Sequence, residues 1–268
     1  RNKDLEDYIT VSLAFDKKLE EKTIYLIKQS LYMNANGSSL IDAMGEKYGA
    51  VIVLSDITRM KQVEKIRQEF VSNASHEIRT PITSIKGFVE TILENGLDDK
   101  EETIHFLKII QKQSDRLAAI INDLLLLSGL EEGGSVPLAT KPIFETLDES
   151  IQTCSFQAKQ KEIQVNLFCD KSLRAPINAP LLEQAIVNLL MNAIAYSPIK
   201  SIVELSANVV NGKLKIMVKD NGIGIPANHL DRLFERFYRV DKSRSRKNGG
   251  TGLGLSIVKH IAQVHGGT

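Results

Sequence analysis

A short segment in the first third of the chain combines a histidine, an acid and a proline. It reads Ser75-His-Glu-Ile-Arg-Thr-Pro81. His76 and Thr80 are four residues apart, so on a helix they share one face. Pro81 lacks the N–H that would bond the carbonyl of Glu77, which predicts a kink beside this face. His76 is therefore a candidate catalytic residue, and a structural or solvated helical histidine is the alternative.

A second group of polar residues interrupts the apolar stretch Asn188-Leu-Leu-Met-Asn192-Ala-Ile-Ala-Tyr196. Asn188, Asn192 and Tyr196 fall at i, i+4 and i+8, on one face of a predicted helix. Asparagine is unfavourable inside helices, and a row of amides needs hydrogen-bond partners. Amide oxygens suit a hard cation such as Mg²⁺, which keeps several waters and bridges substrate phosphates. The alternative is that neighbouring backbone groups satisfy these amides.

The first of two glycine-rich segments, Asp220-Asn-Gly-Ile-Gly-Ile-Pro226, follows a predicted strand. Asp220 at the strand end is a candidate acceptor for an amino group. Gly222 and Gly224 allow a ligand to approach the backbone closely. A simple turn would also explain this segment.

The second glycine-rich segment, Gly249-Gly-Thr-Gly-Leu-Gly-Leu255, opens a predicted helix. The free N–H groups and the dipole at a helix N-terminus form an anion site. The stretch before it is basic and suits a polyphosphate; its cations are Arg236, Arg239, Lys242, Arg244, Arg246 and Lys247. The P-loop, dinucleotide-binding and eukaryotic-type kinase motifs are absent from the sequence.

The composition of the 268 residues is that of a globular protein, with 43% hydrophobic and 25% charged residues. This length favours about two domains. No uninterrupted apolar run exceeds five residues, and Arg1–Thr10 has no signal-peptide pattern. The formal charge of +1 argues against a general nucleic-acid binder, and the two cysteines, Cys154 and Cys169, are too few for a disulfide framework or a zinc site. A soluble protein of a reducing compartment is expected.

The first 58 residues are short in helix signals. Thr23–Met33 and Tyr48–Leu54 are rich in β-branched and aromatic residues, which predicts two strands. The segment between them, Asn34–Ser39, has the composition of a turn. An incomplete sheet of this size is typical of the tail end of a domain.

Two long helices are predicted next. Apolar residues step by three and four from Val63 to Ala74, and again in a helix from about Lys100 to Leu130. The second helix carries a heptad seam broken by two serines, which consists of Leu107, Ile110, Ser114, Leu117, Ile121, Leu124 and Ser128. Asn95–Asp99 reads as the turn between the helices, with Asp98 or Asp99 as the cap of the second. Two such seams favour a dimeric four-helix bundle, and packing against the rest of the chain is the alternative.

The segment Gly129–Pro142 is rich in glycine and proline and predicts a domain boundary. Beyond it, helical patterns alternate with strand patterns. The predicted helices are Leu147–Lys161, Ala179–Tyr196 and Leu255–Val264, and the predicted strands are Ile163–Phe168, Ser201–Val209 and Leu214–Lys219. The expected fold is α+β, with one sheet covered by helices.

Taken in order, these motifs resemble those of the bacterial two-component sensor histidine kinases. The order is histidine segment, asparagine row, Asp-x-Gly-x-Gly, the Phe234–Phe237 pair and Gly-x-Gly-x-Gly, and the similarity covers residues 59–268. The motif details look most like the phosphate-regulon (PhoR) sensor kinases of Gram-positive bacteria, although related cell-wall sensors share much of them. Residues 1–58 resemble the end of a PAS sensor domain, with Asp56-Ile-Thr58 leading into a signalling helix.

The resemblance implies roles for the histidine segment. His76 would be phosphorylated from ATP, and Glu77 would accept its second ring proton during attack. Thr80 would align a water when the protein acts as a phosphatase of its partner. His105 and His260 are expected to be surface or packing residues.

The resemblance also implies a Mg²⁺-ATP site. Asn192 would hold Mg²⁺, Asn188 would support the same face and Tyr196 would lie against the nucleotide. Asp220 would bond the adenine amino group. The remaining implied nucleotide-binding residues are Gly222 and Gly224 for backbone access, Gly250, Gly252 and Gly254 around the phosphates, and Arg236 at the γ-phosphate.

This sequence departs from the family pattern at two places. Ala195 stands where the family usually has a lysine that contacts phosphate, and the family continues beyond Gly266-Gly-Thr268 into a closing β-hairpin. The alanine removes one phosphate contact, which is expected to weaken ATP binding. The absence of the hairpin is expected to leave an unpaired sheet edge.

The sequence thus predicts three parts: residues 1–58 as the end of a PAS-like domain, 59–132 as a dimerisation and phosphotransfer hairpin, and 133–268 as an α/β sandwich that binds ATP. The expected partners are a second copy and a response regulator, without nucleic acid. The expected location is the cytoplasmic portion of a membrane-anchored sensor, whose membrane segments lie outside this chain. The alternative functions are an ATPase clamp of the gyrase and chaperone type and a catalytically weak dimeric scaffold.

Overall fold

The computed structural model describes residues 2–14, 21–27, 29–95, 99–131, 136–240 and 250–268. They form two compact units, residues 1–72 and residues 73–268, which are joined within one long helix. Among the described helices, none combines the length and apolar character that a membrane span requires.

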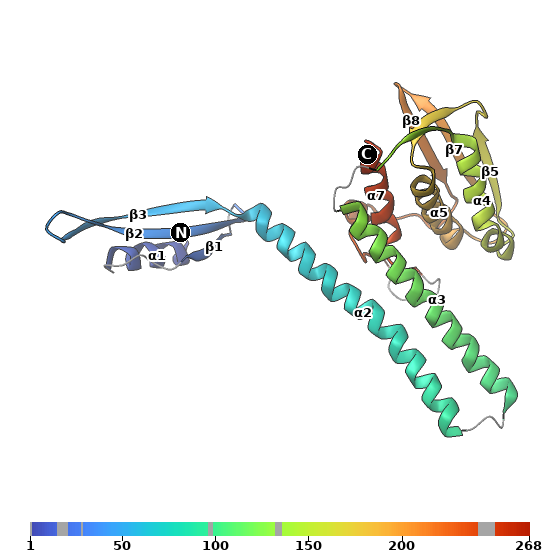
Figure 1. The fold of residues 1–268 in the computed structure, drawn as a ribbon, viewed down its shortest axis with the longest axis horizontal. Coiled ribbons are helices and arrows are strands. Elements are labelled where there is room, and N and C mark those ends of the chain that lie inside the picture. The colour runs from blue at the N-terminus through green and yellow to red at the C-terminus, as the bar shows by residue number, and fades with distance from the viewer. Residues whose placement is uncertain (1, 15–20, 28, 96–98, 132–135, 241–249) are drawn as a thin grey trace. The chain divides into compact units, whose positions relative to one another are not determined.

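The N-terminal unit is a three-stranded antiparallel sheet that packs against one helix (Figure 1). Its elements are α1 (Lys3–Ala14), β1 (Lys22–Leu26), β2 (Leu31–Ile41) and β3 (Lys47–Asp56), and the strand order is β1-β2-β3. Ile24 and Ala35 are buried with Tyr8 of α1 in a small core. A small sheet agrees with the sequence, whereas its third strand was not predicted.

The strand predicted over Thr23–Met33 is wrong in extent. The chain reverses at Gln29 and Ser30, and Ser30 adopts a φ of 54°. The segment is therefore divided between β1 and β2. The β-branched and aromatic composition of this segment predicts one strand and gives no indication of the turn at Gln29 and Ser30.

The turn predicted over Asn34–Ser39 is also wrong, because all six residues lie inside β2 and pair with β3. The strands instead connect at Asp42, whose Oδ1 accepts the N–H groups of Met44 and Glu46 at 2.9 and 2.8 Å. An aspartate that bonds its own backbone in this way stabilises a turn directly. This bonding, and not the Asn-Gly pair, fixes where the hairpin turns.

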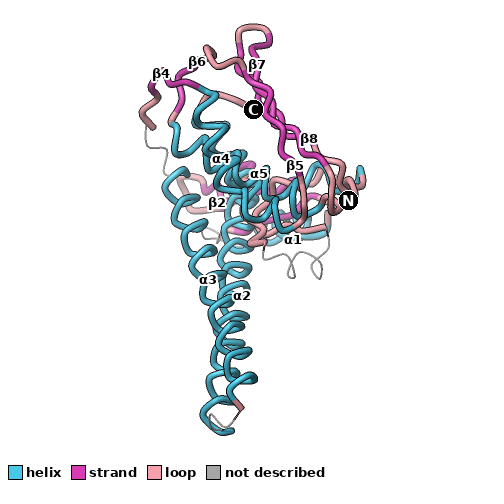
Figure 2. The backbone as a smooth tube through the Cα atoms, turned by 90° about the vertical axis from the view of Figure 1, so that its right-hand side faces the viewer, coloured by secondary structure: helices cyan, strands magenta, loops and turns pink. Residues whose placement is uncertain are grey.

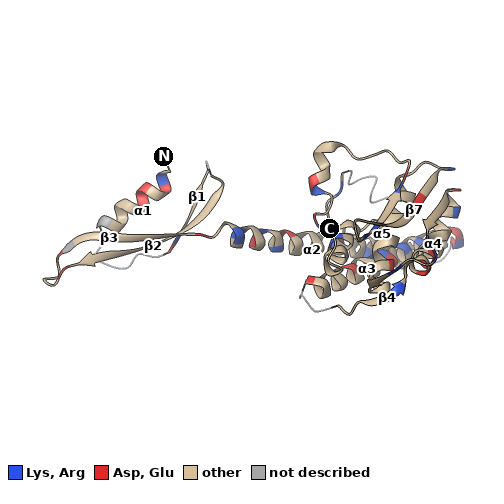
Figure 3. Cartoon of the chain, turned by 90° about the horizontal axis from the view of Figure 1, so that it is seen from above, with Lys and Arg blue, Asp and Glu red and all other residues tan. Residues whose placement is uncertain are grey.

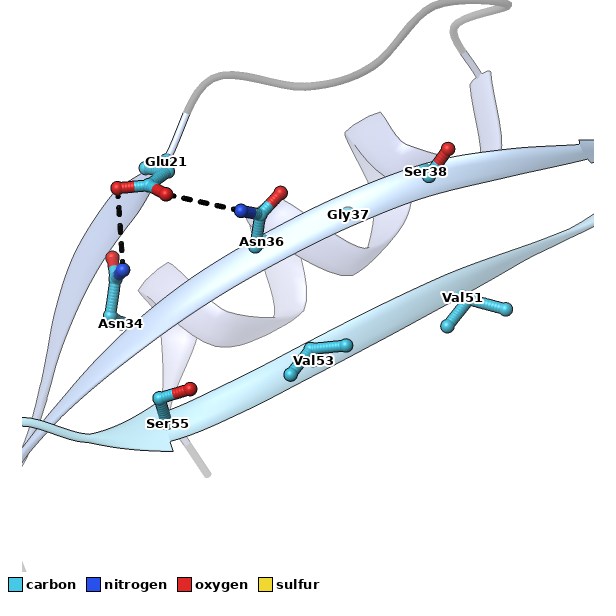
Figure 4. A pocket seen from close by; sticks show the side chains of 8 residues that line it. All are labelled: Glu21, Asn34, Asn36, Gly37, Ser38, Val51, Val53 and Ser55. Carbon is cyan, nitrogen blue, oxygen red and sulfur yellow. Dashed lines mark hydrogen bonds between the residues drawn. The ribbon is translucent and has the colours of Figure 1, made fainter.

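One face of this sheet carries an open polar hollow of about 330 Å³ (Figure 4). Asn34 and Asn36 donate hydrogen bonds to the carboxylate of Glu21 at 3.4 and 3.1 Å. Val51 and Val53 of β3 line the other side. Two amides of β2 thus bind the exposed Glu21 carboxylate at the edge of this hollow.

The junction between β3 and the long helix α2 (Thr58–Asn95) is fixed by two side chains. Asp56 Oδ1 accepts the N–H of Thr58 at 2.8 Å, and the hydroxyl oxygen of Thr58 accepts the N–H of Tyr32 at 2.9 Å. Hydrogen bonds from the Thr58 side chain and backbone lower the pKa of Asp56. The Asp56-Ile-Thr58 sequence therefore ties the sheet to the helix that follows it.

Helices α2 and α3 (Lys100–Glu131) form a long antiparallel hairpin (Figures 1 and 2). Both predicted helices are confirmed, and α2 continues through Pro81. Asp99 caps α3 by accepting the N–H groups of Glu101 and Glu102 at 2.9 and 3.0 Å, as predicted. Residues 96–98 of the predicted turn lie outside the described residues. Figure 3 shows Lys, Arg, Asp and Glu interspersed along the start of α2.

The predicted apolar seam of α3 is only partly covered within one chain. Leu124 packs in a cluster with a C-terminal helix, as one alternative expected. Leu107 and Ile121 are 53% and 43% exposed, and Leu93 of α2 is 76% exposed. Large apolar side chains of both helices therefore remain accessible to another surface.

The remaining chain is an α/β layer that follows the predicted alternation. Its elements are β4 (Ala139–Pro142), α4 (Ile143–Gln160), β5 (Gln164–Cys169), β6 (Arg174–Ile177), α5 (Ala179–Tyr196), β7 (Ile202–Val210), β8 (Lys213–Lys219), η1 (Ala227–Arg232) and α7 (Gly254–Val264). In the main sheet β7 pairs in parallel with β5 and antiparallel with β8, while β4 and β6 form a separate pair. The sequence did not predict β4, β6 or η1.

Helices α4 and α5 cover one face of the main sheet (Figure 1). Leu147, Leu190 and Leu205 are fully buried in the core between these layers. Cys154 lies in the same core, and burial raises the pKa of its thiol to about 11. This core fixes α5, the helix that carries the asparagine row.

Candidate functional site

His76 is exposed on α2, and its neighbour Glu77 is partly buried inside the hairpin. The Oε2 atom of Glu77 accepts a hydrogen bond from Arg116 of α3 at 2.7 Å. The hydroxyl of Thr80 donates to the carbonyl of His76 at 3.1 Å. In this structure Thr80 thus makes the back-bond typical of helical threonine, and a role in positioning water stays a prediction.

The asparagine row lies on α5, whose start is well defined. Asn178 caps this helix by accepting the N–H of Leu181 at 3.2 Å, and Pro180 occupies the first turn. Asn188 Nδ2 donates to the carbonyl of Gly254 at 3.4 Å. Asn192 is one turn further along and partly exposed. The backbone bond made by Asn188 is the alternative that the sequence left open, and it places this amide at the second glycine segment.

The first glycine segment reaches the other end of the same row. Asp220 Oδ1 accepts the N–H of Gly222 at 2.7 Å. A Cβ on Gly222 would lie 2.7 Å from that oxygen and 3.0 Å from the carbonyl oxygen of Tyr196. Gly224 has a φ of +69°, which favours glycine. Only a glycine at position 222 therefore lets this loop lie against the end of α5.

The second glycine segment folds back on the phenylalanine pair. Gly252 has a φ of +79°, and a Cβ there would lie 3.0 Å from Cα of Phe237. Its carbonyl accepts the N–H of Phe237 at 2.8 Å. Gly250 accepts a hydrogen bond from Arg239 Nη2 at 2.6 Å. Lys242, Arg244, Arg246 and Lys247 lie outside the described residues.

The structure therefore brings two predicted loops to one helix. Tyr196 lies beside Gly222, and Asn188 lies beside Gly254, with Asn192 between them on the same face. Eight helical residues span about 12 Å. The loop that carries Asp220 and the start of α7 therefore lie at opposite ends of one face of α5.

Acidic residues of the hairpin contact the glycine-rich C-terminal region. Glu131 pairs with Arg236, which was predicted to reach a γ-phosphate. Glu77 accepts a second hydrogen bond from Arg239 at 3.3 Å. Asp123 Oδ2 accepts one from the hydroxyl of Thr251 at 2.8 Å. Each of these contacts joins a carboxylate of α2 or α3 to a residue of the glycine-rich C-terminal region.

An apolar cluster supports these polar contacts. Leu127 of α3 is buried with Leu253, Ile257 and Ile261 of the α7 region. The pKa of Asp123 is raised because it is desolvated here, and its bond from Thr251 offsets part of that shift. The pKa of His260 is lowered mainly by burial, although Glu131 at 3.5 Å acts in the opposite direction.

Two domain families match this chain. HisKA, the His Kinase A (phospho-acceptor) domain, matches residues 66–133, and HATPase_c, the histidine kinase-, DNA gyrase B- and HSP90-like ATPase, matches residues 177–268. The chain carries the HisKA and HATPase_c domains of a two-component sensor histidine kinase. The helical hairpin and the α/β domain correspond to these two families in that order.

Among curated proteins, this chain is similar to sensor protein kinases named WalK. It is 37% identical over 245 residues to WalK of Staphylococcus epidermidis, covering 90% of this chain and 40% of that protein. It is 35% identical over 243 residues to a WalK of Staphylococcus aureus, covering 90% and 58%. The chain thus spans about half the length of these relatives.

Solved histidine kinases share the fold. AdeS of Acinetobacter baumannii gives a TM-score of 0.57 at 24% identity, covering 70% of this chain and 86% of that one. ThkA in complex with the response regulator TrrA gives 0.55 at 21%, covering 88% and 72%. ShkA in complex with AMPPNP gives 0.51 at 25%, covering 74% and 41%.

Several contacting residues of this chain could not be found from its sequence. Arg116, Asp123 and Glu131 lie on α3, where the heptad pattern drew attention to apolar positions only. Their partners are 39, 128 and 105 residues away in the chain. The sequence offered one indication of them, which is that charged residues interrupt a helix whose apolar pattern predicts packing.

Ala195 stands at the position where the resemblance implies a lysine. Its carbonyl accepts a hydrogen bond from Lys161 at 2.6 Å. Lys161 also donates to the carbonyl of Ile194 at 2.8 Å. Lys161 therefore caps the C-terminus of α5, where a cation is favourable. Among the residues described here, no group of three His, Cys, Asp or Glu side chains could hold a metal.

Proposed function

We propose that this chain transfers the γ-phosphoryl group of ATP to His76 and then to an aspartate of a response regulator. One observation carries the proposal: Arg239 donates both to Gly250 in the glycine segment and to Glu77 beside His76. The loop suited to phosphates is thereby linked to the residue next to the candidate phosphoacceptor.

In the proposed reaction an unprotonated ring nitrogen of His76 attacks the γ-phosphorus. A nitrogen–phosphorus bond forms, the bond to the bridging oxygen breaks, and ADP leaves. Glu77 accepts the hydrogen of the other ring nitrogen as positive charge develops on the imidazole. His76 is exposed, which allows the nucleotide-carrying domain to approach it.

The nucleotide site proposed here extends along α5. Asp220 receives the adenine amino group, Tyr196 lies against the base, and Gly250, Gly252 and Gly254 surround the phosphates. The amide oxygen of Asn192 suits Mg²⁺, supported by Asn188, and Mg²⁺ bound there would neutralise phosphate charge. Gly222 supports the fit, because a side chain there would meet Asp220 and Tyr196.

The direct test is to incubate the chain with γ-labelled ATP and Mg²⁺ and to analyse the protein for acid-labile phosphate. Phosphate at His76 is the expected result. ATP hydrolysis without protein phosphate would favour the ATPase clamp. Failure to bind an ATP analogue with Mg²⁺ would favour the dimeric scaffold, for which Ala195 is the motivation.

The proposal includes a homodimer in which two hairpins form a four-helix bundle. The exposed Leu93, Leu107 and Ile121 support it, because a second hairpin would cover them. For the partner, the solved complex of ThkA with a response regulator is an example on this fold. The proposed parts remain residues 1–58 as a PAS-like end, 59–132 as the phosphotransfer hairpin and 133–268 as the ATP domain.

We propose phosphate starvation as the signalling context, on the details of the histidine and glycine motifs alone. The curated relatives reported above are WalK kinases, so a cell-wall context is the competing outcome. Deleting the gene and measuring the response to phosphate limitation and to cell-wall stress separates the two.

Thr80→Ala is expected to lower dephosphorylation of the regulator by roughly 10-fold or more while changing His76 phosphorylation less than about 2-fold. A water must attack the phosphoaspartate, and the Thr80 hydroxyl lies one turn from His76. The nucleophile in autophosphorylation is the imidazole, which needs no water. The two rates are measured side by side; equal losses in both would contradict the role and favour the observed back-bond to His76.

Glu131→Gln is expected to strengthen binding of an ATP analogue by up to about 5-fold. Arg236 must leave Glu131 to reach a γ-phosphate, and a partly exposed ion pair contributes roughly 0.2–1 kcal/mol. Isothermal titration of wild type and variant measures the change. Glu162→Gln is the control, because it removes an acid of the proposed ATP domain that pairs with Lys200 at 3.7 Å and not with Arg236. Equal affinities in all three proteins would show that Glu131 does not compete.

A further inference from the structure

Arg116 forms a shielded ion pair with Glu77 next to the phosphoacceptor. Its Nη2 lies 2.7 Å from Glu77 Oε2, and the two side chains are only 12% and 17% exposed. The pair joins α3 to α2, with His76 as the adjacent, exposed residue. The carboxylate next to the reacting imidazole is therefore held from within the hairpin.

The way in which Arg116 binds leaves part of its guanidinium unused. Its Nε is buried, and no described residue accepts a hydrogen bond from it. A guanidinium can bind a carboxylate through two nitrogens at once, which fixes the plane of the carboxylate as well as its position. Here the buried Nε–H of Arg116 remains without an acceptor among the described residues.

A second arginine contacts the same oxygen of Glu77. Arg239 Nη2 lies 3.3 Å from the same Oε2 atom and also donates to Gly250. Arg239 belongs to the nucleotide-carrying domain, so its position depends on where that domain lies. Arg116 belongs to the hairpin itself. The contact of Arg116 with Glu77 therefore lies within the hairpin and does not depend on the ATP domain.

We propose that Arg116 is a positioning residue for the phosphorylation of His76, acting through Glu77. It fixes the carboxylate so that one oxygen meets the ring N–H of His76 during attack on the phosphorus. Arg116 itself gives up no proton and touches neither the nucleotide nor the phosphoryl group. This inference rests on the proposed kinase activity and adds to it a residue that the sequence motifs did not include.

The test is a double-mutant cycle of Arg116→Met with Glu77→Gln. The rate of His76 phosphorylation is measured in single turnovers at saturating Mg²⁺-ATP. Arg116→Met is expected to slow it about 10-fold, with binding of an ATP analogue unchanged within about 2-fold. The double variant is expected to be no slower than Glu77→Gln alone, because Arg116 has nothing left to position.

Lys112→Met is the matched control, since it removes an exposed cation one turn earlier on α3. Arg116→Met as fast as this control would overturn the proposal. A double variant slower than Glu77→Gln by a further 10-fold would also overturn it, because a general loss of structure acts whether or not Glu77 is charged.

Arg116→Lys covers the case in which Arg116→Met does not fold. Lysine keeps the charge that Glu77 requires but provides only a point contact, so a several-fold loss of rate is expected at unchanged thermal stability. Full activity in Arg116→Lys would overturn the positioning role. If the wild-type chain places no phosphate on His76, the proposed kinase function itself fails, which the same assay reveals before any variant is compared.

Discussion

His76→Gln is expected to abolish acid-labile phosphate on the protein while leaving ATP-analogue binding unchanged. Glutamine has no ring nitrogen that can form the nitrogen–phosphorus bond, so the loss should reach background. The residue is exposed on α2, and glutamine is a good helix former, so the hairpin should keep its stability. Labelling with γ-labelled ATP and calorimetric binding are measured on the same preparation.

His105→Gln is the matched control for this experiment. His105 lies exposed on α3 of the same hairpin and was predicted to be a surface residue. It should keep full phosphorylation. Phosphate retained in His76→Gln would move the acceptor elsewhere, with His105 and His260 as the next candidates. His260 is the less accessible of these, because it lies partly buried beside Glu131.

The helices that hold the site could be predicted because each of their segments has a single, regular apolar spacing. Helices α2, α3 and α5 each show a three-to-four residue apolar spacing, and the predicted bounds of α5 are those observed. The sequence predicted strands β5 and β7 but not their order or direction, and the structure shows that they pair in parallel. Short elements such as β4 and β6 carry too few residues for a pattern, and β4 contains a proline.

The first unit was predicted less well because local turn signals compete there with strand pairing. Six residues from Asn34 to Ser39 have turn composition, yet their backbone groups are satisfied by β3. The actual turn depends on one carboxylate, Asp42, bonding two nearby N–H groups. A sequence shows that such an aspartate is present but not which of two polar segments the sheet will use.

The candidate nucleotide site was predicted as a set of motifs, and the structure adds how they meet. Gly222 needs its hydrogen because Tyr196 lies against it, and this contact joins residues 26 positions apart in sequence. The ion pairs made by Arg116, Glu131 and Arg239 were not predictable. They depend on helix rotation and domain contact, which no periodicity within one segment encodes.

Asn192→Asp and Asn192→Ala are expected to reduce His76 phosphorylation by about 10²-fold or more, which is the second large effect. Asn192 lies between Asn188, which contacts Gly254, and Tyr196, which lies beside Gly222. Aspartate would place a negative charge among the phosphates, and alanine would remove the amide oxygen that suits Mg²⁺. Both substitutions are measured by Mg²⁺-dependent ATP binding and by phosphate incorporation.

The two variants should leave the domain folded, because the apolar side of α5 makes its core contacts. Leu190, Ala193 and Ile194 are buried there, whereas Asn192 is partly exposed. Asn208→Asp makes the same chemical change at an exposed position on β7 and controls for added charge. In a mixed dimer, an Asn192→Asp subunit keeps an intact His76 and should receive phosphate from a His76→Gln partner if transfer runs between subunits.

Autophosphorylation at the wild-type rate by Asn192→Asp alone would remove this residue from the metal site. A selective loss, with unchanged melting temperature and a normal Asn208→Asp control, would place the chemistry on the face of α5 where both glycine segments meet.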